Sequence, residues 1–141
     1  MNFTLDNGEK VMFRQYEAND FEAVQQLNAR EGWNTLVERG EETKEAFENS
    51  NVTYIVEKEN NIVGYLRGMT DKQITLYISE LIIGEELRGS GIGKTLLQYV
   101  HNIYPKTRME LLGLSTSKAF YDKLEFRSFY GFRKVVEEWR D

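Results

Sequence analysis

The sequence predicts a single α/β domain in which strands and helices are mixed along the chain. Its 141 residues are the size of one domain, and 40% are hydrophobic and 29% charged, as in ordinary globular proteins. Segments with the two-residue period of strands alternate with segments that have the helical period. No repeat or Ser/Pro-rich linker divides the chain, and its only proline is Pro105. We therefore expect one domain over residues 1–141.

The first part of the chain predicts a strand followed by two helices. Residues 11–17 place Val11, Phe13 and Gln15 on one side and Met12, Arg14 and Tyr16 on the other, which is compatible with a strand. Asn19 and Glu22 have the spacing of a capping box, and an apolar helical pattern begins at Phe21. A second helix is predicted over about residues 41–49.

Three strands are predicted in the middle of the chain. Residues 52–58 and 62–69 are rich in Val, Ile and Tyr, and they flank a short polar turn at 59–61. This arrangement is a hairpin signal. A third strand covers about residues 73–83, and its end is too apolar for a half-exposed edge. We expect it to be a buried central strand.

The last third of the chain alternates again between helix and strand. A glycine-rich break at 84–91 precedes a helix over 91–103, whose apolar side chains recur at helical spacing. Pro105 ends this helix. The remaining predicted segments are a strand at 108–114, a helix at 116–124 and one or two antiparallel strands in the aromatic-rich stretch 126–139.

Composition excludes several classes of function. The absence of cysteine excludes disulfides and thiolate chemistry, and the single histidine, His101, excludes a two-imidazole site, so we expect no metal. A net charge of -5 argues against binding to duplex nucleic acid. No apolar run approaches the roughly 18 residues of a membrane span, and the N-terminus does not resemble a signal peptide. We expect a cytoplasmic protein without nucleic-acid or membrane partners.

The glycine-rich segment between a strand and a helix is the most informative part of the sequence. Four of the 11 glycines fall between Gly84 and Gly93. Glycine permits positive φ and lets a ligand approach the backbone, and the first N–H groups of a helix have no intrahelical partners. Such a segment is typical of a phosphate site. The alternative is a plain strand-to-helix turn.

The glycine spacing departs from two common nucleotide-binding motifs. A P-loop has four residues between its first glycine and Gly-Lys-Ser/Thr, whereas three residues separate Gly89 from Gly93-Lys94-Thr95. A dinucleotide-binding fingerprint would need glycine at position 94, where the chain has lysine. A small nucleotide-binding regulator that uses the same loop stays an alternative.

The pattern Arg-x-x-Gly-x-Gly at Arg88, Gly91 and Gly93 resembles the GCN5-related N-acetyltransferase (GNAT) family. Leu-Ile-Ile at 81–83 is similar to the Leu-x-Val end of the family's fourth strand. Phe-Tyr-Asp-Lys-Leu-Glu-Phe at 120–126 is similar to its Phe-Tyr-Glu-Lys-Leu-Gly-Phe segment. The resemblance implies a central mixed, mostly antiparallel twisted sheet, flanked by helices, with splayed central strands.

Two positions depart from the family pattern. Glu125 stands where the family usually has glycine, and Gly-Glu-Glu-Leu at 84–87 replaces the frequent Asp-Pro-Glu-aromatic sequence. Both lie in turns, so we expect the local geometry of these turns to differ.

The resemblance implies acetyl-coenzyme A as the co-substrate. Its pyrophosphate would lie on the backbone N–H groups of the glycine-rich loop, and its pantetheine arm would run along Leu81, Ile82 and Ile83. The implied loop contacts are Arg88, Gly89, Ser90, Gly91, Ile92, Gly93 and Lys94.

The resemblance also implies acetyl transfer to a primary amine by direct attack on the thioester. Tyr121 matches the tyrosine that many GNAT enzymes use as general acid toward the coenzyme sulfur, and the alternative is packing against neighbouring aromatic rings. A backbone N–H at Ile82 or Ile83 would polarise the carbonyl. Glu80 is the candidate base, with a solvated edge carboxylate as the alternative.

The acceptor side of the family usually comes from the first two helices and their loop, which here contains Glu31 and Trp33. These two side chains could receive a cationic amine, although Trp33 could equally belong to the core. A non-catalytic acyl-coenzyme A sensor or regulatory module on the same fold is the alternative function. The aromatic stretch 126–139 could supply a homodimer surface. The sequence identifies neither the amine nor the length of the acyl group.

Overall fold

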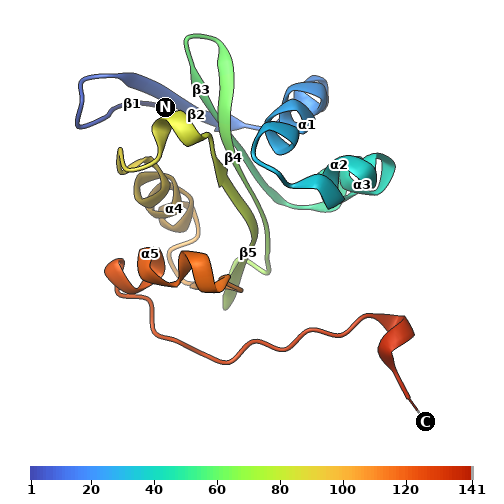
Figure 1. The fold of residues 1–141 in the computed structure, drawn as a ribbon. Coiled ribbons are helices and arrows are strands. Elements are labelled where there is room, and N and C mark those ends of the chain that lie inside the picture. Colours follow the sequence, from blue (N-terminus) through green and yellow to red (C-terminus); the bar gives the residue numbers. More distant parts are fainter. Residues whose placement is uncertain (141) are drawn as a thin grey trace. The chain divides into compact units, whose positions relative to one another are not determined.

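The computed structural model describes residues 1–140 and contains a six-stranded sheet with helices on both faces (Figure 1). The strands lie side by side in chain order, and every neighbouring pair is antiparallel except the parallel pair β5 and β6. This confirms the expected mixed, mostly antiparallel sheet. The strands are β1 (Asn2–Thr4), β2 (Lys10–Gln15), β3 (Val52–Lys58), β4 (Asn61–Thr70), β5 (Thr75–Ile83) and β6 (Arg108–Leu111).

The helices follow the predicted order, with one short helix added. Figure 1 shows α1, α2 and α3 on one side of strands β3 to β5 and α4 on the other. The helices are α1 (Phe21–Arg30), α2 (Asn34–Glu38), α3 (Gly40–Asn49), α4 (Ile92–Ile103) and α5 (Lys118–Lys123). The 3-10 turns are η1 (Ala18–Asp20), η2 (Glu85–Leu87), η3 (Ser115–Ser117) and η4 (Val136–Glu138).

The chain contains two compact units, residues 1–111 and a unit that begins at Leu112. The first unit holds the whole sheet and helices α1 to α4, and the second holds α5 and the C-terminal stretch. A single domain over residues 1–141 stays a prediction.

The β3–β4 hairpin forms where the sequence predicts it. Lys58 pairs with Asn61, which leaves Glu59 and Asn60 as a two-residue turn. Both turn residues have positive φ, 52° and 65°. A turn with positive φ at both central residues matches the twist of the flanking strands, so the hairpin closes without splaying.

The core is divided between the two faces of the sheet. On one face, side chains of α1 and α3 pack against strands β3 to β5, in a cluster of Val24, Leu27, Phe47, Ile55, Tyr65 and Ile82. On the other face, Leu96 and Val100 of α4 are fully buried, and the Tyr99 ring contacts the rings of Phe13 and Tyr54. Because both faces are covered, the central strands are apolar on both sides.

The C-terminal stretch corrects one prediction. The sequence predicts strands within 126–139, but the described residues there contain only the short turn η4 and no strand. Phe129, Tyr130 and Phe132 are 81%, 94% and 91% exposed. Aromatic residues favour strands mainly through packing on a pleated surface, and these exposed side chains have little such packing. The homodimer surface expected here stays a prediction.

Candidate functional site

Strand β5 has a strand neighbour on both sides only in its first half. Its parallel pairing with β6 ends at Ile78 opposite Leu111, whereas its antiparallel pairing with β4 continues to Ile83. Within residues 1–140, the segment 79–83 therefore has no strand on the β6 side. The central strands are splayed, as the family resemblance implies.

A β-bulge lies where the splayed segment begins. Gly68 of β4 pairs with Ile78 and Arg67 pairs with Glu80, so Ser79 is the extra residue on β5. A Cβ at Gly68 would lie 2.4 Å from a backbone carbonyl oxygen of β5. Glycine at this position therefore allows the two strands to approach at the bulge.

The backbone of the splayed segment directs two N–H groups to its open side. The Gly84 N–H donates to the carbonyl oxygen of Val63 at 2.7 Å, toward β4. Hydrogen-bonding groups point to alternate sides along a strand, so the Ile82 N–H also faces β4. The same alternation directs the N–H groups of Leu81 and Ile83 to the open side.

The glycine-rich loop presents a group of free N–H donors. Gly89 and Gly91 have φ of 81° and 85°, and Gly91 is the N-cap of the 12-residue helix α4. Arg88 and Ser90 use their N–H groups in turns within the loop, at 3.2 and 3.3 Å. Among residues 88–94, the N–H groups for which residues 1–140 provide no acceptor are those of Gly89, Gly91, Ile92, Gly93 and Lys94.

These free donors fit an anion. They lie at or just before the positive end of the α4 dipole, and no side chain caps that helix end. The Lys94 side chain belongs to an exposed residue on the first turn of the helix. Backbone N–H groups, the helix dipole and one cation together match the chemistry of a pyrophosphate.

Glu31 follows the end of α1 and contacts the glycine-rich loop. One carboxylate oxygen accepts the N–H of Glu85 at 3.1 Å, and the other is paired with the Arg88 guanidinium. The Glu31 side chain is 6% exposed and that of Arg88 is 58% exposed. Both oxygens of the expected acceptor-binding carboxylate thus have partners on the loop. The Trp33 side chain is 39% exposed, so this residue is not in the core.

Glu80 forms a bidentate ion pair with Arg67, its partner on β4. The Nε–Oε1 distance is 2.6 Å and the Nη2–Oε2 distance is 2.5 Å. The two side chains are 10% and 14% exposed, so Glu80 is not a solvated edge carboxylate. An ionised carboxylate has about four lone-pair positions, and Arg67 occupies two of them. The other two can accept a proton directly or through water.

Tyr65, beside this ion pair, is held as a neutral phenol. Burial first, and then the charge of Glu80, raise its pKa above the ordinary range. Its hydroxyl donates to the Asn28 side chain at 2.8 Å. Asn28 is fully buried, so the two polar groups satisfy each other inside the core.

Tyr121 lies on α5 in the second unit. Its ring makes edge contacts with Phe120 and Phe126, at centroid distances of 4.9 and 5.4 Å. Burial raises the pKa of its phenol, and no partner among the described residues bonds to the hydroxyl. The ring of Tyr121 therefore packs against its aromatic neighbours, as the alternative interpretation predicts. Its hydroxyl has no partner among the described residues, so proton donation by Tyr121 stays a prediction.

Glu125, the departure from the family's glycine, has a φ of 64°. This is the left-handed conformation that glycine adopts without strain. The backbone of this turn thus has a conformation suited to glycine although the residue is glutamate.

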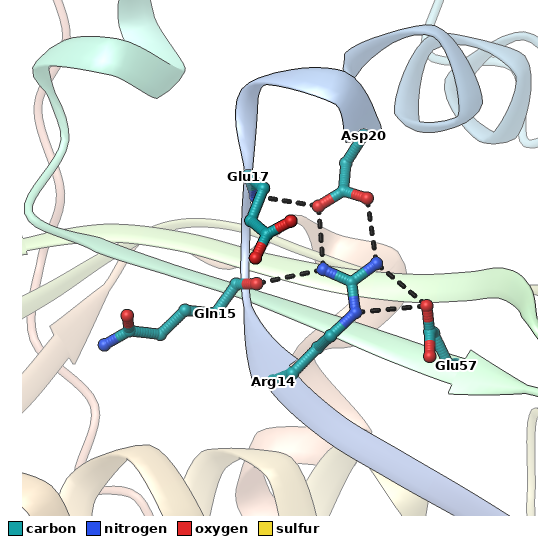
Figure 2. Close-up of polar contacts among 5 residues, drawn as sticks. All are labelled: Arg14, Gln15, Glu17, Asp20 and Glu57. Atoms are coloured by element: carbon teal, nitrogen blue, oxygen red, sulfur yellow. Dashed lines mark hydrogen bonds and ion pairs between the residues drawn. The ribbon is translucent and has the colours of Figure 1, made fainter.

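Arg14 forms an ion cluster that the sequence does not predict (Figure 2). Its guanidinium donates two bonds of 2.8 Å to Asp20 in η1 and two bonds of 2.8 and 3.0 Å to Glu57 on β3. Asp20 also accepts the Glu17 N–H at 2.7 Å, and the Arg14 guanidinium lowers the pKa of the Asp20 carboxyl. The cluster fastens the start of α1 to β2 and β3. Charged residues are common on the exposed side of a strand, so Arg14 and Glu57 do not stand out in the sequence. Only the fold brings them together with Asp20.

A surface hollow of about 720 Å³ lies near α1 and the β3–β4 turn. Its lining includes the Arg14 cluster together with Arg30, Lys58 and Glu86. It includes neither residues 79–83 nor the N-terminus of α4, so it is separate from the free N–H groups of the glycine-rich loop. Among residues 1–140, no three acidic or histidine side chains form a metal site, and no helix could span a membrane.

Within residues 1–140, this is an α/β protein in which β5 has no strand neighbour on one side along residues 79–83 and helix α4 begins with free N–H groups. Residues 49–128 match the family model described as an acetyltransferase (GNAT) domain. Because this match covers more than half of the sequence, the chain belongs to the GNAT acetyltransferase family. No curated protein matches the chain.

Solved structures share the fold at low sequence identity. A GNAT-family acetyltransferase from Streptococcus pneumoniae superposes with a TM-score of 0.75 at 20% identity, over 91% of this chain and 99% of the other. A predicted acetyltransferase from Clostridium acetobutylicum, solved with acetyl-CoA, gives 0.67 at 17% identity, over 89% and 95%. An aminoglycoside acetyltransferase from a soil metagenome, solved with sisomicin, gives 0.66 at 17%, over 89% and 96%.

Proposed function

We propose that this protein transfers an acetyl group from acetyl-coenzyme A to a primary amine. The observation that carries the proposal is the group of free N–H donors at Gly89 and residues 91–94, beside a β5 edge without a strand neighbour. In a chain of the acetyltransferase family, these two features suit the pyrophosphate and the pantetheine arm of one coenzyme.

The coenzyme would bind mainly to backbone atoms. Its pyrophosphate would accept the free N–H groups of the loop, with a further charge-assisted contact from Lys94. The amides of its pantetheine arm would pair with the open edge of β5, where Leu81 and Ile83 direct their N–H groups. Ile83 is therefore the better candidate than Ile82 for polarising the thioester carbonyl.

The reaction would be a direct acyl transfer. The lone pair of a neutral amine attacks the thioester carbonyl carbon, the carbonyl oxygen gains negative charge, and the C–S bond then breaks. The amine loses a proton to a base and the departing thiolate gains one from an acid. The chain has no cysteine that could form an acyl-enzyme, so one transfer step is the simplest route.

We assign the proton-transfer roles to Tyr121 and Glu80. A phenol is protonated at neutral pH, and burial raises the pKa of Tyr121 further, so this group would donate its proton to the thiolate. The Glu80 carboxylate would accept the amine proton through its two free lone-pair positions, directly or through water. Tyr121→Phe removes only the hydroxyl, and we expect turnover to fall by about 10²-fold with coenzyme affinity unchanged. Wild-type turnover would leave Tyr121 with a packing role alone.

The acceptor would approach Trp33, whose ring is partly exposed after α1. Glu31 is a weaker candidate for this contact, because both of its oxygens are bound to the glycine-rich loop. Aminoglycosides belong in a test panel of amines because a protein of similar fold is an aminoglycoside acetyltransferase.

Three measurements test the proposed function. Calorimetric titration with coenzyme A measures binding, and release of free thiol from acetyl-coenzyme A measures transfer to each amine of a panel of polyamines, amino acids, aminoglycosides and peptides. Coenzyme binding without thiol release for any amine would favour the acyl-coenzyme A sensor. A rise in melting temperature with ATP but not with coenzyme A would favour the nucleotide-binding regulator.

A further inference from the structure

Glu31 joins two segments that lie far apart in the sequence. It follows α1, whereas its partners Glu85 and Arg88 begin the glycine-rich loop more than 50 residues later. The Glu31 side chain is 6% exposed, so its charge requires partners in the folded protein. Glu85 N–H and the Arg88 guanidinium are those partners.

We propose that Glu31 is a positioning residue for the coenzyme loop, and that Arg88 acts as a strut of this loop through Glu31 rather than as a phosphate ligand. The inference rests on the proposed function, because it assigns the loop to the pyrophosphate. The sequence places Glu31 in contact with the amine and Arg88 in contact with the coenzyme. In this proposal, both side chains instead support the backbone of the loop.

Glu31 contacts the loop close to the point where the loop follows β5. The Glu85 N–H belongs to the first residue of η2, and Arg88 is the last residue before the two glycines with positive φ. Glycines lose the most conformational freedom when a loop is ordered. A carboxylate that holds the segment just before them reduces the freedom that coenzyme binding must remove.

The ion pair also explains why backbone groups dominate the anion site. A guanidinium already paired with Glu31 would have to leave a buried carboxylate in order to reach a phosphate. That exchange would leave Glu31 with the Glu85 N–H as its single partner. Retaining the ion pair avoids an uncompensated buried charge.

Variants of Glu31 test the positioning role in the full-length protein. Glu31→Ala removes both bonds, and we expect the dissociation constant of coenzyme A to rise about tenfold. Glu31→Gln can still accept the Glu85 N–H, so a smaller rise is expected. Glu22→Gln, at an exposed position on the helix that precedes Glu31, is the matched control. Tighter or unchanged coenzyme binding in Glu31→Ala would overturn the proposal.

Steady-state kinetics separate positioning from general destabilisation. We expect a higher KM for acetyl-coenzyme A in Glu31→Ala, with kcat and the acceptor KM close to wild type. A fall in kcat at saturating coenzyme would overturn the positioning role. Arg88→Gln tests whether Arg88 supports the loop through Glu31 or contacts the phosphate. If it acts through Glu31, the double variant Glu31→Ala/Arg88→Gln should bind coenzyme A no more weakly than Glu31→Ala alone. Additive losses would show that Arg88 contacts the phosphate directly.

Hydrogen exchange of the ligand-free protein tests the same role without coenzyme. We expect faster exchange of amides 84–95 in Glu31→Ala, and wild-type exchange there in Glu22→Gln. If the wild-type protein binds no coenzyme A but this exchange difference is found, the proposed function fails, while the ordering of the loop by Glu31 is still supported. Unchanged exchange in Glu31→Ala contradicts the positioning role, whatever the coenzyme result.

Discussion

Replacing Gly91 should weaken coenzyme binding through the backbone rather than through a steric clash. Gly91 has φ 85°, and a Cβ built there meets nothing nearer than a carboxylate oxygen of Asp6 at 4.0 Å. The left-handed conformation costs a residue with a Cβ roughly 1–2 kcal/mol, and more for a β-branched residue. Gly91→Val should therefore relax toward negative φ when no coenzyme is bound, which redirects the N–H groups that start α4.

To bind the coenzyme, the Gly91→Val loop must return to the wild-type conformation with positive φ at position 91. The free-energy cost of that conformation therefore sets the loss of affinity. A penalty of about 1–2 kcal/mol corresponds to a 5- to 30-fold higher dissociation constant for coenzyme A, measured by calorimetry. Gly91→Asn is the matched control, because asparagine tolerates positive φ, and we expect a change of less than about threefold. If Gly91→Val lowers the melting temperature but binds coenzyme A as wild type does, the loop is strained without being the binding site.

Three further predictions concern stability. Gly68→Ala should lower the free energy of unfolding by about 2 kcal/mol in urea titrations, because its Cβ would lie 2.4 Å from a backbone oxygen. Gly40→Ala on α3 is the control: a Cβ has room there, so the substitution should be neutral or stabilising. Arg14→Met should destabilise by about 2 kcal/mol at pH 7. Arg14 lowers the pKa of Asp20, so this stability is present above the ordinary Asp pKa and is lost as pH falls through the lowered value; an equal deficit at pH 7 and pH 3 would contradict this account. Glu125→Gly should raise the melting temperature by a few degrees, since it relieves up to about 1 kcal/mol of left-handed strain; a lower melting temperature would show that this strain is absent.

Local patterns are sufficient to predict most elements of this fold. The hairpin around residues 59–61, the buried strand that ends at Ile83 and the helix after Gly91 all depend on neighbouring residues, and all three are present. Strand β1 has three residues, too few to show a period. The stretch 126–139 has the composition of a strand, yet strand formation depends on packing that composition does not specify.

The candidate site was predictable only in its backbone. The glycine pattern reveals where N–H groups are free, because helix ends and positive φ are local properties. The partners of side chains are not local. The sequence places Glu31 toward an amine, and it makes Glu80 a candidate base with a solvated carboxylate as the alternative. It does not predict that the fold pairs these two side chains with Arg88 and Arg67, respectively.

Helix α1 is attached to other elements at both of its ends. At the N-terminal end, Asp20 is bound to Arg14 on β2, and after the C-terminal end Glu31 is bound to the loop that leads into α4. A helix attached at both ends connects the position of the loop to the position of the sheet. In the proposed function the amine would bind near Trp33 and the pyrophosphate on the loop, so a displacement of the segment around Trp33 would be transmitted through α1 to the loop. Occupancy of one proposed substrate site would then alter the affinity of the other without any contact between the two substrates.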